Sequence, residues 1–286
     1  MIWSNRQLTI REISEDLNIF YGSIQNILTT DLNIRQVSVK FVRVLMVKQT
    51  TTDLNIRQVS VKFVPCVLMV KQTQQRLSIS LELRDRAASD SSFLGNIMGD
   101  ETWVYGYDPE TRVQSSQWKS PSSPRVKKAC QSRSNIKVMI VFFDLHGIVW
   151  AEFVSRNTTV NSEYYKGLLE CLRNDVHRKW PKKRANGFTL HHNNAPCHTL
   201  LLVRQFLSNK NITVCSHPPY SSDLAPCNFW LFPKVKMTMK GKCFESIQDT
   251  EAATTAQLKT LMQEDFQNCF RKWQERWDKC VQSEGD

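Results

Sequence analysis

The sequence predicts an α/β protein in which a mixed β-sheet is covered by helices. From about residue 93 onward, β-rich runs and helical patterns follow one another in the order β-β-β-α-β-α-β-α. Polar loops stand at the ends of several of these core elements, where functional sites are commonly built. Before them, a short helical segment in the first 33 residues predicts a smaller N-terminal part.

The composition limits the classes of partner. Apolar residues make up 41% of the 286 residues, enough for a real core. A net charge of +11 and a pI near 9.3 favour a polyanionic partner, with DNA or RNA ahead of acidic lipid. The alternative is a soluble basic protein without such a partner. Nine scattered cysteines without a Cys-x-x-Cys pair fit reduced thiols. We expect no secretory signal and no membrane span, since no apolar run approaches about 20 residues.

Residues 1–33 predict two short helices around a tight turn that contains Gly22. The apolar residues of the first helix share one face: Ile10, Ile13 and Leu17. This is the outline of a helix-turn-helix, whose second helix enters the major groove of DNA, and an ordinary helical hairpin is the alternative. The residues of the second helix that could reach base edges are Ser23, Gln25 and Asn26.

Residues 34–90 predict a linker with a tandem duplication. The segment 29–42 recurs as residues 51–64. A solenoid needs at least three copies, so two copies indicate a duplication within a linker. The linker would end in a polar, amphipathic helix at 74–88.

Residues 91–286 predict the α/β domain itself. Its first strand lies within 93–105 and holds Asp100 among apolar residues, which is costly unless the carboxylate is paired or bound to a metal. Glu101 would point to the opposite face of the strand. A long polar connection follows at 108–135, and connections of this length are usually functional or disordered.

The later elements follow from their periodicity. They are a hairpin at 136–144 and 148–154, a helix after Asn161, strands at 187–192 and 212–215, and helices at 200–207, 227–240 and 247–262. A basic cluster at 178–184 could hold DNA phosphates or serve nuclear import, and a solvated helix end is the alternative. The last helix carries an aromatic stripe that we expect in the core: Phe266, Phe270, Trp273, Trp277 and Val281.

Two loops carry the most specific sequence motifs. Residues 190–199 read LHHNNAPCHT and residues 220–229 read YSSDLAPCNF. They resemble the HDNAPxHT and YSPDLAPxDY/F motifs of mariner-type DNA transposases, and Gly-Asp-Glu-Thr-Trp at 99–103 resembles the GDExW motif of that family. The resemblance covers nearly the whole chain, from about Leu8 to Asp286.

The resemblance implies a ribonuclease-H-like fold and cut-and-paste DNA strand cleavage and transfer with Mg²⁺ or Mn²⁺. In that family three aspartates hold the metals, and the matching positions here are Asp100, Asn193 and Asn228. The 34 residues between the two asparagines equal the family spacing. Magnesium prefers carboxylate oxygens, so two neutral amides predict impaired metal binding and lost cleavage, with Asp100 as the remaining metal ligand.

The resemblance also implies partners and a location. They are the terminal inverted repeats of a transposon, a possible homodimer and the nucleus, with no small-molecule substrate. The second repeat copy is followed by a proline, and Lys62-Phe63-Val64-Pro65 is similar to the family's linker motif. Residues 108–135 resemble its clamp loop, which reaches the partner protomer and DNA, and a solvated basic loop is the alternative. The loop cations that we assign to DNA contact are Arg125, Lys127 and Lys128.

Several alternatives stay open at this point. Residual nicking could use Asp100 with Asp144 or Asp223 as a substitute ligand, and the chain could be a non-functional, decayed reading frame. The histidines and cysteines around 191–217 suggest zinc, but their spacing fits no common zinc finger. Some relatives are fused to a SET methyltransferase, and nothing in these 286 residues looks like a SET domain.

Overall fold

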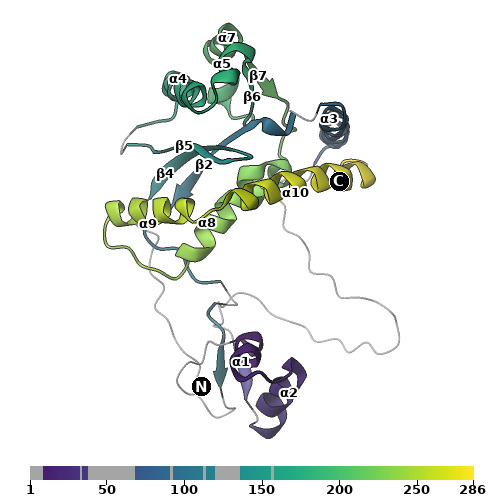
Figure 1. Cartoon of the computed structure of the whole chain (residues 1–286), viewed down its shortest axis with the longest axis vertical. Coiled ribbons are helices and arrows are strands. Elements are labelled where there is room, and N and C mark those ends of the chain that lie inside the picture. Colours follow the sequence, from purple (N-terminus) through teal and green to yellow (C-terminus); the bar gives the residue numbers. More distant parts are fainter. Residues whose placement is uncertain are drawn as a thin grey trace. The chain divides into compact units, whose positions relative to one another are not determined.

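The computed structural model describes residues 9–32, 34–37, 68–90, 93–111, 114–119, 136–155 and 158–286. These residues form two compact units (Figure 1). The first unit holds the described residues of 9–37 and 107–119, and the second those of 68–106 and 136–286. Within the described ranges, no helix is both long enough and apolar enough to span a membrane.

The first unit contains the two predicted N-terminal helices. Helix α1 (Ile10–Leu17) starts at Thr9, whose side chain and that of Glu12 cap each other's backbone N–H groups. Helix α2 (Tyr21–Asn26) continues into the π-helical turn η1 (Ile27–Asp31). The core of this unit is small and consists of Ile13, Ile24, Leu28 and Ile34, with Ile10 packed against it.

One short strand of the first unit comes from the connection that the sequence analysis left without structure. Strand β1 (Arg35–Val37) pairs antiparallel with β3 (Gln117–Lys119). The polar connection at 108–135 is therefore not a loop throughout, because its backbone supplies hydrogen bonds to a strand from the predicted linker. Both strands are three residues long, too short for a periodic pattern to reveal.

The second unit is built on a five-stranded mixed sheet of order β5-β4-β2-β6-β7. The strands are β2 (Ile97–Val104), β4 (Lys137–Asp144), β5 (Gly147–Phe153), β6 (Phe188–His191) and β7 (Ile212–Cys215). Neighbours from β5 to β2 are antiparallel, and β2, β6 and β7 are parallel. This confirms the predicted mixed sheet covered by helices.

Helices cover both faces of this sheet (Figure 1). One layer contains α4 (Ser162–Lys179), α5 (Pro181–Asn186) and α7 (Leu201–Asn209). The other contains α8 (Phe232–Met239), α9 (Ile247–Lys259) and α10 (Gln263–Gln282). Shorter helical segments are η2 (Phe93–Gly95), α6 (Pro196–Thr199), η3 (Ser222–Leu224) and η4 (Cys227–Leu231).

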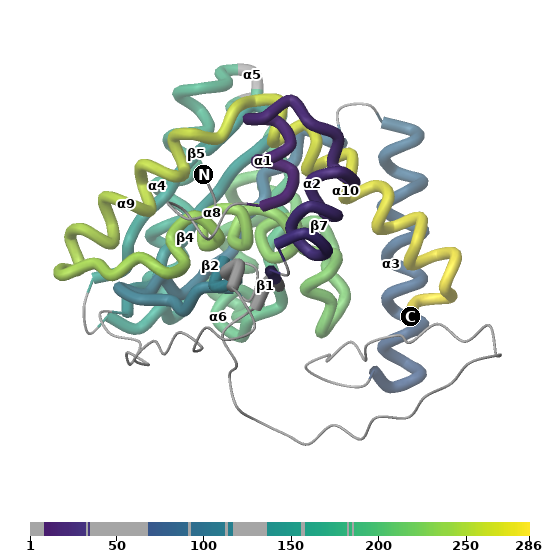
Figure 2. The backbone as a smooth tube through the Cα atoms, turned by 90° about the horizontal axis from the view of Figure 1, so that it is seen from below, coloured from purple at the N-terminus to yellow at the C-terminus, as the bar shows by residue number. Residues whose placement is uncertain are grey.

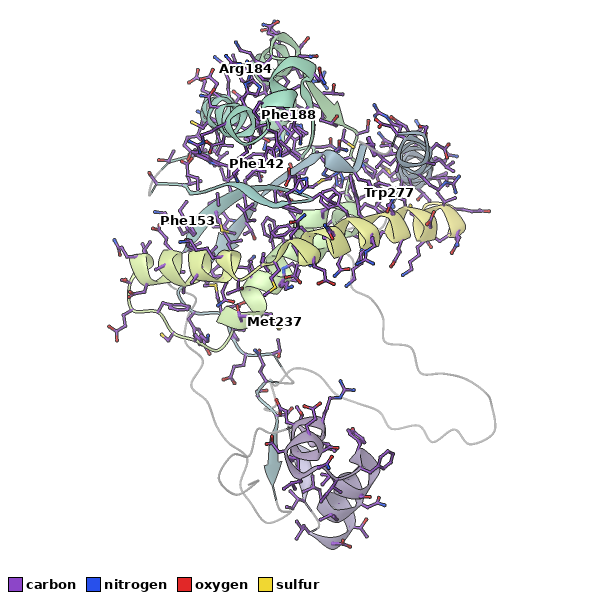
Figure 3. All side chains as sticks on the ribbon, viewed as in Figure 1. Phe142, Phe153, Arg184, Phe188, Met237 and Trp277 are labelled. Atoms are coloured by element: carbon purple, nitrogen blue, oxygen red, sulfur yellow. The ribbon has the colours of Figure 1, made fainter. Side chains whose placement is uncertain are left out.

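The alternation of strand residues gives each layer its own core. Met98, Val141 and Phe143 pack toward α8 and α10, whereas Ile140 and Phe142 pack toward α4 and α7. Figure 3 labels Phe142 and Trp277, which belong to these two different cores.

Gly99 sits where the sheet has no room for a side chain. It pairs with Phe142 on the neighbouring strand, and a Cβ at Gly99 would stand 2.2 Å from the Phe142 ring. The glycine before Asp100 therefore has a packing reason.

The helix α3 (Val70–Ser89) belongs to the second unit, which corrects the predicted linker of residues 34–90. Figure 2 shows α3 alongside α10, and the two helices are in contact. Leu83 of α3 is buried in the same core as Trp277 of α10. The helix predicted at 74–88 is present within α3, and only its assignment to the linker differs.

The aromatic stripe of α10 is core, as predicted. Its aromatic members are almost fully buried: Phe266, Phe270, Trp273 and Trp277. Val281, the last predicted member, is only partly buried, and Cys280 beside it is buried instead.

Candidate functional site

Three side chains from distant parts of the sequence meet at one edge of the parallel strands. Met98 of β2 pairs with His191 of β6, so the residues two positions further along, Asp100 and Asn193, lie side by side. Asn228 reaches the same point from η4, the helical turn that precedes α8. The structure thus brings together the three residues that the sequence analysis assigned to the site.

The two asparagines donate hydrogen bonds to the one aspartate. Asn193 Nδ2 lies 2.7 Å from Asp100 Oδ1, and Asn228 Nδ2 lies 2.5 Å from Asp100 Oδ2. The backbone N–H of Glu101 donates a third hydrogen bond to Oδ1 at 2.8 Å. Both oxygens of the Asp100 carboxylate therefore already accept hydrogen bonds.

The orientation of Asn193 is fixed from both ends of its amide. Its nitrogen donates to Asp100, while its oxygen accepts the backbone N–H of Ala195 at 3.0 Å. Turning the amide over would break both hydrogen bonds at once. The donor end of Asn193 is consequently the end that faces the carboxylate.

Asp100 is 5% exposed, and burial raises its pKa to about 7. This value is the net of burial and the charge of Glu101, which raise the pKa, and of the hydrogen bonds donated by the Glu101 backbone and by Asn228, which lower it. Because the two asparagine amides are neutral, the site holds at most one full negative charge on these three side chains.

A second polar cluster lies on the opposite face of β2, where the sequence analysis placed Glu101. Glu101 Oε1 is 3.0 Å from His198 Nε2, and Tyr165 Oη is 2.8 Å from His192 Nδ1. The His192 and His198 rings stack at a centroid distance of 4.9 Å. Burial and His198 lower the pKa of His192 to about 3, so this ring is neutral.

The loop at 220–229 is held by two arginines that the sequence analysis did not single out. Arg76 of α3 forms a bidentate pair with Asp223, at 2.9 and 3.0 Å, and Arg76 is only 4% exposed. Arg276 of α10 donates to the backbone oxygen of Asp223 at 3.0 Å. Trp273 Nε1 donates to the backbone oxygen of Leu224 at 2.8 Å. Nothing in the local pattern of α3 distinguishes Arg76 from a solvated cation.

The two carboxylates considered as substitute ligands are engaged elsewhere. Asp223 is paired with Arg76. Asp144 accepts the backbone N–H of His146 at 2.8 Å, and Lys183 Nζ lies 3.9 Å from its other oxygen. The strand register places Asp144 opposite Ile97, roughly 10 Å along the sheet from Asp100.

These residues do not fit a two-metal centre as they stand. Two metal ions need several anionic oxygens around them, and the site offers one carboxylate with both oxygens hydrogen-bonded. Across the described ranges, no group of three or more His, Cys, Asp or Glu side chains is arranged to hold a metal ion. For zinc, His192 and His198 already direct ring nitrogens at Tyr165 and Glu101.

The predicted DNA-contacting residues fall into two sets. Ser23, Gln25 and Asn26 are exposed on α2, as a contact with base edges requires. The second set lies outside the described residues: Arg125, Lys127 and Lys128.

Two lysines of the basic cluster at 178–184 donate hydrogen bonds to backbone oxygens of the protein itself. Lys179 donates to the Ile148 oxygen at 2.7 Å and Lys183 to the Gly95 oxygen at 2.9 Å. Burial lowers the pKa of Lys183, partly offset by Asp144. Arg184, labelled in Figure 3, remains exposed.

Comparison with known sequences gives two curated relatives. The chain is 32% identical over 198 residues to the Mariner Mos1 transposase of Drosophila mauritiana, which covers 68% of this chain and 56% of that protein. It is 25% identical over 280 residues to the histone-lysine N-methyltransferase SETMAR of Homo sapiens, which covers 97% of this chain and 37% of that protein. The chain thus spans about half the length, or less, of these relatives.

A family description and solved structures agree with these relatives. The family model "Transposase (partial DDE domain)" matches residues 108–186, a stretch that contains none of Asp100, Asn193 and Asn228. The fold matches the Mos1 mariner paired end complex with Mn at a TM-score of 0.75 and 24% identity, covering 98% of this chain and 75% of that one. It matches the Mos1 catalytic domain with Raltegravir and Mg at 0.65 and 26% identity, covering 77% and 98%.

Proposed function

The chain belongs with the mariner-type transposases by sequence and by fold, and we propose that it is a DNA-binding descendant of such a transposase that no longer cuts or joins DNA. The observation that carries this proposal is the pair of amide hydrogen bonds that Asn193 and Asn228 donate to Asp100. A site that once presented oxygens to metal ions now presents N–H groups to its own carboxylate.

The proposed loss of catalysis follows from the small number of negative charges at the site. A structure of the Mos1 catalytic domain holds Mg, which fits the divalent metal chemistry of mariner transposases. Two divalent ions placed a few ångströms apart repel each other strongly unless anionic ligands neutralise them. Asp100 supplies at most one negative charge, and the two amides supply none. We infer that metal affinity is too low for strand cleavage.

DNA binding rests on different observations. The net charge of +11 favours a polyanion, and α2 exposes Ser23, Gln25 and Asn26 on a helix-turn-helix outline. The Mos1 structures include a paired-end complex with the left transposon end. We propose transposon-end DNA as the ligand, a homodimer as the binding form, and the nucleus as the location.

Residual nicking through Asp100 is the enzyme-class alternative. It requires a substitute carboxylate, and the two nearest candidates in the sequence analysis, Asp144 and Asp223, are engaged away from Asp100. No described contact favours this alternative over loss of activity.

Strand cleavage is the direct test. The unmodified chain and its Asn193→Asp/Asn228→Asp variant would be incubated with end-labelled terminal-repeat DNA in Mg²⁺ and in Mn²⁺. We expect no cleavage by the unmodified chain. Cleavage by the variant alone would attribute the loss to the two asparagines, whereas cleavage by the unmodified chain would refute the proposal.

DNA binding is tested separately by gel shift over a range of salt. We expect the affinity for duplex DNA to fall steeply as salt rises, because phosphate contacts release counterions. The matched variant is Ser23→Ala/Gln25→Ala/Asn26→Ala, which alters three exposed residues and leaves the core of the first unit in place. Absence of binding at every salt concentration would refute the DNA-binding part.

A further inference from the structure

A second cavity, of about 450 Å³, lies at the amino end of strands β6 and β7, and we name it the Thr189 cavity. Asn193 of the site described above follows the opposite, carboxyl end of β6. The walls of the cavity come from four segments of the second unit: the end of α3, residues 93–96 before β2, helix α5, and the two strands. It is therefore separate from the cluster around Asp100.

Two neighbouring threonines lie in the wall formed by the strands. Thr189 of β6 pairs with Thr213 of β7, so both side chains lie on the same face of the sheet. Neither hydroxyl has a hydrogen bond to any described residue. Gly187, just before β6, has a φ of +73°, and a Cβ there would stand 2.2 Å from the Asn211 oxygen, so the beginnings of the two strands are held close together. The two free hydroxyls therefore have fixed positions.

Asn96 brings a hydrogen-bond donor without an acceptor to the same cavity. The residue is 3% exposed, and its amide nitrogen has no hydrogen-bond partner in the described part of the chain. Buried polar atoms nearly always have a partner, and an unpartnered one costs stability. An oxygen of a bound ligand would satisfy this amide.

The charged side chains in the wall leave one excess positive charge. They are Arg86, Lys183 and Asp90. Burial lowers the pKa of Lys183, and Asp144, at 3.9 Å, offsets only part of this effect. The pair of Arg86 with Glu82 is long, at 3.5 Å, and exposed, so it contributes little. A bound anion would add negative charge beside both cations.

The donors around the cavity favour a phosphate group. Hydroxyl, amide, guanidinium and ammonium donors come from separate segments, and the oxygens of a phosphate point in tetrahedral directions, whereas those of a carboxylate share one plane. Arginine and lysine form strong charge-assisted hydrogen bonds with phosphate. The volume falls within the roughly 300–1,000 Å³ of small-molecule sites. Two aromatic residues, Phe93 and Phe188 (labelled in Figure 3), give one part of the wall apolar character.

We propose that the Thr189 cavity binds the phosphate group of a small molecule. The donors are Thr189, Thr213, Asn96, Arg86 and Lys183. The ligand is either inorganic phosphate or a phosphate monoester whose organic group packs on Phe93 and Phe188. This binding requires neither DNA nor a metal ion, so it does not rest on the proposed function.

Isothermal titration calorimetry of the full chain tests the ligand class. Inorganic phosphate, phenyl phosphate and acetate are titrated at equal pH and ionic strength. Both phosphates should bind at least about tenfold more tightly than acetate, because they engage more charge-assisted hydrogen bonds. Tighter binding of phenyl phosphate than of inorganic phosphate assigns the site to a monoester, and equal affinity assigns it to inorganic phosphate. If neither binds more tightly than acetate, the proposal is overturned.

Two variants of exposed residues locate the binding in the cavity. Arg86→Gln removes a cation, and Thr213→Val removes a hydroxyl while keeping a β-branched side chain on the strand. Each should weaken phosphate binding about tenfold, the effect of losing one strong hydrogen bond. The matched control is Arg84→Gln on the same helix, because Arg84 has a 43% exposed side chain, against 44% for Arg86, and does not line the cavity. It should bind phosphate as the unmodified chain does. An equal loss in the control, or no loss in either cavity variant, overturns the proposal.

Duplex DNA separates this proposal from the proposed function. Arg86→Gln and Arg84→Gln each lose one positive charge, so we expect them to bind duplex DNA equally tightly. If Arg86→Gln and Thr213→Val weaken duplex binding as much as phosphate binding, the cavity belongs to a DNA surface and the small-molecule proposal is overturned. Failure of the unmodified chain to bind any duplex refutes the proposed DNA binding instead, and the phosphate titration then still decides on the cavity.

Discussion

The two ends of one loop make an instructive comparison. Asp223 and Asn228 are five residues apart in the stretch that resembles a mariner signature. Asp223 keeps its charge and is paired on both oxygens with the buried Arg76. Asn228 has no charge and donates its amide to Asp100. Asp223, the carboxylate that holds the loop in place, is present, while position 228, which matches a metal ligand of the family, is neutral. The residues that stabilise the loop are therefore distinct from those that would bind metal.

The difference has a physical basis. Loss of the Asp223 charge would leave a buried guanidinium unpaired, which destabilises the fold. Loss of a charge at position 228 removes repulsion from Asp100 and adds a hydrogen bond. The stability of the fold therefore requires an aspartate at position 223 but tolerates an asparagine at position 228, whether or not the site is catalytic.

The largest expected effect concerns the pH dependence of stability. The pKa of Asp100 is about 7 in the folded protein, above the roughly 4 of an unfolded aspartate. The folded state therefore binds this proton more tightly, and the associated stability is complete below pH 4 and lost as the pH rises through 7. We expect this contribution to fall by roughly 3 kcal/mol between pH 4 and pH 7.5.

Urea unfolding at several pH values measures this effect. Asp100→Asn should remove most of the slope between pH 4 and pH 7.5. If the slope is the same in the wild type and in Asp100→Asn, the buried carboxylate is not its source.

The next largest effect is expected from disrupting the ion pair between Asp223 and Arg76. Asp223→Asn leaves Arg76 buried opposite a neutral amide, and we expect a loss of about 2–3 kcal/mol of unfolding free energy, since Asp223 is itself partly exposed. Arg76→Met should lose less, because the aspartate that remains can be hydrated. Chemical denaturation of both single variants and the double variant gives the coupling energy. Strictly additive losses would show that the pair does not hold the loop.

A smaller effect is expected when the charges are put back. Asn193→Asp/Asn228→Asp replaces two donated hydrogen bonds by repulsion among three carboxylates, at a loss of about 1–2 kcal/mol near neutral pH without metal. Because bound cations would relieve that repulsion, Mg²⁺ or Mn²⁺ should raise the melting temperature of the variant. The unmodified chain should melt at the same temperature in metal and in chelator. A metal-dependent shift in the unmodified chain would contradict the view that its site is satisfied without metal.

The smallest effect concerns the backbone of the loop. Arg276 donates to the Asp223 oxygen and lies over the Phe229 ring at 4.2 Å from its centroid. Arg276→Lys should cost about 0.5–1 kcal/mol, because the planar guanidinium contact is lost and the charge is kept. Thermal melting measures it, with Arg271→Lys on the exposed side of α10 as the matched control. If both substitutions lower the melting temperature equally, Arg276 does not anchor the loop.

Periodicity predicted the sheet, and the resemblance of three motifs to those of mariner-type transposases implied that Asp100, Asn193 and Asn228 meet. The sequence did not predict how the three side chains bond to one another, since amide orientation follows from the assembled site. Arg76 was missed for the same reason: its partner Asp223 is 147 residues away, and no local rule marks the pair. Strands β1 and β3 were missed because each is three residues long, too short for a periodic pattern.

The contact between α3 and the residues after α10 also bears on how the protein is made. Arg76 Nε donates to the Gly285 oxygen at 2.9 Å across 209 residues of sequence. A Cβ at Gly285, where φ is +94°, would stand 2.2 Å from the Thr73 oxygen, so the two segments fit tightly. During synthesis α3 therefore leaves the ribosome long before its partner exists, and its apolar face stays uncovered for that time. We therefore expect the second unit to close late, only after residues 263–286 have been synthesised.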